Sequence, residues 1–137
     1  MVNKTDIRAR YQETDQMGII YHSNYFVWFD IGRTEFFREL GYDYKNLEDI
    51  GILLPVIDVG CKYKKAAKYD DEIIIETSIE KLKGVKLKFK YNIVRKEDKE
   101  TLAEGYTLHG FVDKNLKPVN FKKKYNDIWN RLFQSIE

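Results

Sequence analysis

The sequence predicts a single α+β domain over residues 1–137, in which one long, mostly buried helix is wrapped by an antiparallel sheet of about five strands. Two observations predict this class. Residues 25–40 contain no proline and begin with an apolar run, which favours a buried helix. From about residue 57 onward, apolar and polar residues instead alternate with a period of two, as in half-buried strands.

The helix is preceded by a weak strand pattern over residues 2–11 and a polar, glycine-containing loop over residues 13–18. Ser23 or Asn24 is a suitable N-cap, and Gly41 stands where a left-handed residue would end the helix. The first half of the helix is almost uniformly apolar, with Tyr25, Phe26, Val27, Trp28, Phe29 and Ile31. We therefore expect protein on most sides of this half, supplied by a curled sheet and in part by a second subunit.

Four alternating runs follow the helix, over about residues 57–64, 73–79, 85–93 and 102–112. They are separated by the turn signals Asp70-Asp71, Lys83-Gly84 and the charged run 95–100. Because strands joined by tight turns are antiparallel neighbours, we expect a meander in chain order. After a turn at 113–118, helical spacing predicts a C-terminal amphipathic helix with the apolar residues Tyr125, Ile128, Trp129, Leu132, Phe133 and Ile136.

The composition excludes several classes of function. The 24 basic and 22 acidic residues leave a formal net charge of +2, whereas a dedicated nucleic-acid-binding protein carries a strong basic excess. Cys61 is the single cysteine and, with His22 and His109, offers too few ligands for a structural zinc site. The glycine motifs of dinucleotide and phosphate sites are missing. We therefore expect no metal, no cofactor and no nucleic-acid partner.

The sequence also predicts a cytoplasmic location. No window approaches the ~20 apolar residues that cross a bilayer, so we expect no membrane span. Residues 1–10 carry charges where a signal peptide has an apolar run. One cysteine cannot form an intrachain disulfide, which fits a reducing compartment.

The segment 11–25 contains an aspartate, a glycine three residues later, two apolar residues and then Tyr-His-x-x-Tyr at the start of the helix. This pattern resembles the signature of the hotdog-fold 4-hydroxybenzoyl-CoA thioesterase family, in particular its YbgC-like acyl-CoA thioesterases. Further agreement extends through nearly the whole chain, at Arg33-Thr34-Glu35, Tyr69-Asp70-Asp71, Ala103-Glu104-Gly105, His109 and Val112-Asp113. The resemblance implies a hotdog fold, hydrolysis of acyl-CoA, and a homo-oligomer, either a dimer or a dimer of dimers.

The resemblance implies two catalytic positions. Asp15 matches the catalytic aspartate of the family, acting as nucleophile or as general base for water. His22 matches the residue at the helix start whose backbone N–H points at the thioester carbonyl. Taken without the resemblance, Asp15 is a turn residue or cap, and the ring of His22 caps or packs near the helix start.

Substrate contacts are predicted on both sides of the catalytic pair. Tyr21, Tyr25 and Gly18 are candidates for the acyl site, although aromatic residues at helical spacing also fit an ordinary core. The phosphates of coenzyme A, which is part of the substrate, require cations. Lys64 and Lys65 are the favoured candidates in a wider set of Lys62, Lys68, Lys81 and Lys83. Alternative functions are hydrolysis of an acyl carrier protein thioester and acyl-CoA binding without turnover; RNA binding is disfavoured by the charge balance.

Overall fold

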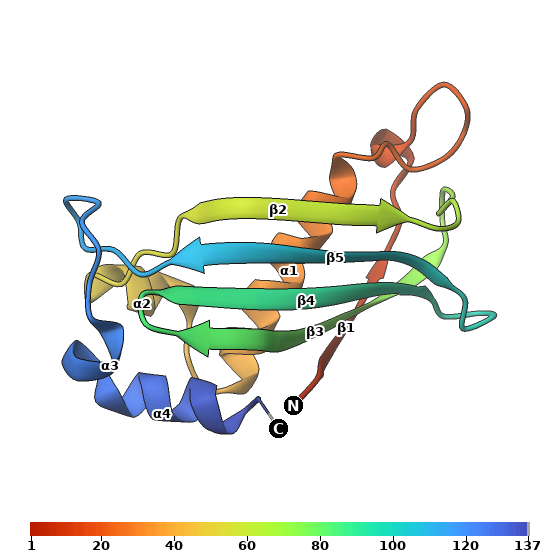
Figure 1. Cartoon of the computed structure of the whole chain (residues 1–137). Helices are drawn as coiled ribbons and strands as arrows, with labels where there is room; N and C mark the ends of the chain where they lie inside the picture. Colours follow the sequence, from red (N-terminus) through yellow and green to blue (C-terminus); the bar gives the residue numbers. More distant parts are fainter. Residues whose placement is uncertain (137) are drawn as a thin grey trace.

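The computed structural model describes residues 1–136, with residue 44 described by its backbone alone. Its strands form one antiparallel sheet in the spatial order β1-β3-β4-β5-β2 (Figure 1). The strands are β1 (Asn3–Arg8), β2 (Val56–Tyr63), β3 (Glu72–Lys83), β4 (Lys86–Arg95) and β5 (Thr101–Gly110). The helices are α1 (Asn24–Glu39), α2 (Tyr44–Asp49), α3 (Phe121–Lys124) and α4 (Asn126–Gln134), with a 3-10 turn η1 (Tyr11–Glu13). The predicted α+β class and the number of strands are confirmed.

Helix α1 lies against one face of the sheet (Figure 1). The ring of Phe29 stacks on the ring of Tyr91 in β4, with centroids 4.4 Å apart. Gly32 permits the close approach of helix and sheet, because a Cβ at this position would collide with the side chains of Thr77 and Ile75 in β3. Aromatic packing and one glycine therefore fix the position of α1 over the sheet.

The opposite face of α1 is not covered by any part of residues 1–136. Val27 is 49% exposed, Asp30 is exposed, and Phe26 and Ile31 are half-buried. Within residues 1–136 the sheet therefore packs along one side of the helix, and the cover expected from a second subunit stays a prediction. The physical reason is that a sheet packs against a helix along one side only.

The strand order departs from the predicted meander at one place. Strands β3, β4 and β5 are neighbours in chain order, as predicted. Strand β2, however, pairs with β5, and β3 pairs with β1, so β2 and β3 are not adjacent. The segment 64–71 is not a tight turn: it crosses the end of the sheet, where the carbonyl of Ala67 accepts a hydrogen bond of 2.9 Å from the N–H of Ile20. This crossing brings a distant segment beside the start of α1.

The two ends of α1 differ in how well the sequence predicts them. Gly41 has a φ of +95° and ends the helix in the left-handed conformation, as expected. Ser23 occupies the N-cap position, but its side chain makes no capping hydrogen bond. The side chain of Asn24 donates instead to the backbone carbonyl of Glu13 at 2.9 Å. The predicted side-chain cap is therefore not formed, and Asn24 instead ties the start of α1 to the loop before it.

The predicted C-terminal helix is divided into α3 and α4. The break falls at Tyr125, whose φ of −129° and ψ of 59° are not helical. Trp129 and Leu132 are buried as expected, whereas Phe133 is 60% exposed because it points away from the core. No helix within residues 1–136 is long and apolar enough to cross a membrane.

Candidate active site

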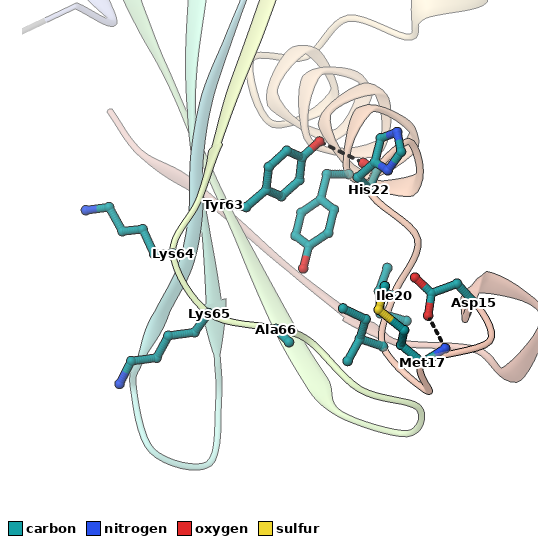
Figure 2. Close-up of a pocket in the computed structure, with 10 residues that line it drawn as sticks. Asp15, Met17, Ile20, His22, Tyr63, Lys64, Lys65 and Ala66 are labelled. Carbon is teal, nitrogen blue, oxygen red and sulfur yellow. Dashed lines mark hydrogen bonds between the residues drawn. The ribbon is translucent and has the colours of Figure 1, made fainter.

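A cavity of about 350 Å³ lies between the loop before α1, the start of α1 and the segment that follows β2 (Figure 2). Its lining residues are Asp15, Met17, Ile19, Ile20, His22, Tyr25, Tyr63, Lys64, Lys65 and Ala66. The structure thus brings together five of the residues predicted for the site, from segments about 40 positions apart in the chain. Tyr21 and Gly18, also predicted, do not line it.

The Asp15 carboxylate is held in a fixed orientation by its own loop. Its Oδ1 accepts a hydrogen bond of 2.8 Å from the N–H of Met17 (Figure 2). The Asp15 N–H donates to the carbonyl of Ile19 at 2.9 Å, and the N–H of Gly18 donates to the carbonyl of Asp15 at 3.1 Å. Gly18 has a φ of +79°, which explains a glycine at this turn. No side chain or N–H within residues 1–136 hydrogen-bonds to Oδ2, so the half-buried carboxylate has one oxygen available.

Backbone N–H groups are available at the start of α1. The N–H of Tyr21 donates to Glu13, and the N–H groups of Asn24 and Tyr25 donate to the carbonyls of Tyr21 and His22. The N–H groups of His22 and Ser23 have no hydrogen-bond partner in the described part of the chain. Unpaired N–H groups at the positive end of a helix form a site for developing negative charge.

Tyr63, the last residue of β2, is a site residue that sequence reasoning did not single out. Its hydroxyl donates a hydrogen bond of 2.9 Å to the backbone carbonyl of His22 (Figure 2). Its ring meets the ring of Tyr25 edge to face, with centroids 5.0 Å apart. Burial, followed by the neighbouring Cys61, raises the pKa of Tyr63 to about 12, so the hydroxyl keeps its proton across the neutral range. Alternation placed Tyr63 on a strand, but no local signal identifies its partner.

The far wall of the cavity is fastened by charged groups outside it. The guanidinium of Arg95 donates from Nη2 to the carbonyl of Ala66 at 2.8 Å and from Nε to Asp71 at 3.2 Å. Asp71 in turn accepts a hydrogen bond of 2.9 Å from the N–H of Lys68. The segment 64–68 is therefore an ordered wall, although it has no regular secondary structure.

Both predicted lysines line the cavity, but their side chains point away from it (Figure 2), and both amines are paired. Lys64 Nζ lies 2.9 Å from Glu104, and Lys65 Nζ lies 3.1 Å from Glu100. Lys81 and Lys83, also considered for the phosphates of coenzyme A, lie at the opposite end of β3 (Figure 1). Lys81 and Lys83 are therefore too far along the sheet to belong to the site.

Of the other positions that the sequence singles out, Tyr21 lies at the border of the site and His109 lies in the core. Tyr21 is exposed, and its ring is 4.3 Å from the ring of His22. His109 is fully buried in β5, where it contacts the Leu54 carbonyl and Thr107. Within residues 1–136, no group of three or more His, Cys, Asp or Glu side chains is placed to hold a metal ion.

A long helix packed on an antiparallel sheet is the arrangement of the hotdog fold, and the similar solved structures are hotdog-fold thioesterases. The chain belongs to the thioesterase-like superfamily, whose family model matches residues 9–127. It is 39% identical over 134 residues to the putative acyl-CoA thioesterase YneP of Bacillus subtilis, covering 97% of this chain and 96% of that protein. It is 30% identical to the acyl-CoA thioesterase YbgC of Haemophilus influenzae, covering 92% and 93% of the two chains.

A solved structure gives the same classification. The DHNA-CoA thioesterase from Staphylococcus aureus superimposes with a TM-score of 0.92 and 33% sequence identity, covering 97% of this chain and 89% of that chain. The family expected from the segment 11–25 and the hotdog fold are therefore confirmed.

Proposed function

We propose that this protein hydrolyses an acyl-CoA thioester to the free acid and coenzyme A, with water as the second substrate. One observation carries the proposal: the carboxylate of Asp15 and the start of α1, with the unpaired N–H of His22, border the same cavity. Thioester hydrolysis needs little more, because the carbonyl is electrophilic and a thiolate leaves without a strong acid.

Asp15 acts in one of two ways. As a general base it removes a proton from water while the water oxygen bonds to the carbonyl carbon. As a nucleophile its own oxygen forms that bond, and water then hydrolyses the resulting anhydride. In both routes the N–H of His22 stabilises the oxyanion, the C–S bond breaks and coenzyme A leaves as a thiolate. One such N–H donor typically contributes about 2.7–4 kcal/mol to the transition state.

The cavity lining supports the binding of an acyl group. Ile20 and Tyr25 give the cavity an apolar wall, and Lys64 and Lys65 stand beside it. A phosphate of coenzyme A would exchange for the glutamate partner of each lysine, since both ion pairs are exposed and therefore weak. Tyr21 and Gly18 remain predictions for substrate contact.

The proposed reaction needs neither a metal nor a cofactor, because coenzyme A is part of the substrate. We also propose a cytoplasmic location. The single cysteine, Cys61, supports it, since proteins of oxidising compartments commonly contain paired cysteines.

We further propose that the active species is a homo-oligomer, a dimer or a dimer of dimers. Strand β2 is an edge of the sheet and exposes Val56, Ile57 and Val59. Val27 on the uncovered face of α1 is also exposed. An apolar edge strand is a template for pairing with another strand, so a second copy of β2 is the partner we propose.

The test is the release of free thiol from a panel of acyl-CoA esters and from an acyl carrier protein loaded with the same acyl groups. We expect turnover of acyl-CoA. Faster turnover of the carrier-protein thioester would instead favour that substrate class. Saturable binding without thiol release would overturn hydrolysis and leave a binding module.

A further inference from the structure

We propose that Glu13 is a positioning residue for the reaction proposed above, holding Asp15 and the start of α1 in register. Glu13 lies two residues before Asp15 and is only 5% exposed. It does not line the cavity, so it has no contact with a substrate bound there. The proposal rests on the proposed function, because it concerns the geometry of that site.

The side chain of Glu13 fastens the loop to the body of α1. Its Oε2 accepts a hydrogen bond of 3.0 Å from the indole N–H of Trp28, which is 1% exposed and belongs to α1. Its Oε1 accepts a hydrogen bond of 2.8 Å from the N–H of Arg10, and the Arg10 guanidinium lies 3.5 Å away. Each carboxylate oxygen thus has a donor, which a buried charge requires.

The backbone of Glu13 holds the residues on either side of His22. Its carbonyl accepts a hydrogen bond of 2.8 Å from the N–H of Tyr21 and one of 2.9 Å from the side chain of Asn24. A single residue therefore links the loop that carries Asp15 to both ends of the turn that presents the N–H of His22.

These links matter for the rate because they set the separation between a carboxylate and an N–H donor. A displacement of about 1 Å in such a pair can lower a rate about 100-fold. In the sequence Glu13 belongs to a polar loop, and no local signal assigns it a particular role. An acidic residue buried beside a tryptophan is evident only when the loop is folded onto α1.

The experiment compares Glu13→Gln, Trp28→Phe and the double variant, with Thr107→Val as a matched control. In Glu13→Gln, the NH2 group of the amide faces either the Arg10 N–H or the Trp28 indole N–H. Two donors then face each other, so one hydrogen bond is lost. Trp28→Phe removes the indole N–H and keeps an aromatic ring. Thr107→Val removes a buried hydroxyl that contacts Tyr91 and His109, away from the cavity. We expect kcat to fall about 10- to 100-fold in both single variants with KM changed less than about 3-fold.

The double variant should lose no more than the product of the two single losses, because both substitutions act on hydrogen bonds of the same side chain. For Thr107→Val we expect kcat to fall no further than the loss of thermal stability explains. If kcat of Glu13→Gln falls in the same proportion to its own loss of stability, Glu13 is merely structural and the proposal is overturned. If Glu13→Gln does not fold, Asn24→Ala removes the hydrogen bond to the Glu13 backbone carbonyl and leaves the carboxylate in place. An unchanged kcat in Asn24→Ala would then overturn the proposal.

Two outcomes distinguish failure of this proposal from failure of the proposed function. Absence of acyl-CoA turnover in the unmodified protein overturns both. Turnover that requires Asp15 but is indifferent to Glu13 and Trp28 overturns the positioning role alone.

Discussion

The hydroxyl of Tyr63, at the end of β2, donates a hydrogen bond of 2.9 Å to the backbone carbonyl of His22, just before α1. The two residues are 41 positions apart in the chain. The same carbonyl accepts a hydrogen bond of 3.3 Å from the N–H of Tyr25. Strand β2 thereby supports the turn that presents the proposed oxyanion site.

Tyr63→Phe should lower kcat about 5-fold with little change in KM, since it removes one hydrogen bond worth about 1 kcal/mol and keeps the ring. Steady-state kinetics on acyl-CoA measure both constants. Tyr106→Phe is the matched control, because the Tyr106 hydroxyl donates to Asp58 over the same distance of 2.9 Å and does not line the cavity. Equal losses in the two variants would contradict a specific role for Tyr63.

Asp15→Asn should lower kcat about 10²- to 10⁴-fold, because an amide is neither a base nor a nucleophile of comparable strength. The fold should persist, since an amide oxygen can still accept the hydrogen bond from Met17. Circular dichroism and thermal melting check the fold, and thiol release checks the rate. A variant that retains most of its activity would rule out the proposed mechanism.

His22→Ala should retain far more activity than Asp15→Asn, because alanine keeps the backbone N–H. His22→Pro, which lacks that N–H, should lose about 10²- to 10³-fold in kcat. Comparing kcat for the two variants separates the contribution of the backbone from that of the ring. A collapse in the alanine variant, with folding intact, would show that the ring is catalytic.

The protein should sediment as a dimer or tetramer at micromolar concentration, with an interface above ~1,000 Å². Val59→Lys should dissociate it and reduce activity, because a charge on the apolar edge strand opposes pairing. Phe133→Lys, at an exposed position of α4, is the control and should leave sedimentation unchanged. A fully active monomer in analytical ultracentrifugation would refute the proposed assembly.

Stability should decrease as the pH falls from about 6.5 to about 4. Burial, and then the nearby Arg33 guanidinium, lower the pKa of His109 from 6.5 to about 4. Between these pH values the unfolded state binds a proton that the folded state does not. The free energy of unfolding is therefore lower at pH 4 than at pH 6.5, by about 3 kcal/mol. Denaturant titration at several pH values measures the free energy of unfolding. His109→Gln should flatten this dependence, and an unchanged slope would argue against His109 as its source.

Much of the local structure could be predicted because it depends on neighbouring residues. The alternation of Leu87, Phe89 and Tyr91 with lysines predicts β4 correctly, and all three apolar side chains are buried. Gly41 ends α1 as predicted for the same reason: its conformation is a property of the residue itself. The motif around Asp15 and His22 also predicted the family correctly, since its spacing lies within one segment of sequence.

How these elements meet is evident only in the folded chain. The pairing of β2 with β5 instead of β3 arises from competition among distant strands, which no local pattern records. The same holds for the buried Glu13 carboxylate and for the hydroxyl of Tyr63, whose partners Trp28 and His22 are fixed by packing rather than by sequence spacing. Most strands, the long helix and the family motif could thus be predicted from the sequence, because backbone preference and periodicity are local. The cavity, its supporting contacts and the uncovered face of α1 required the folded chain, because they arise between segments that are remote in sequence.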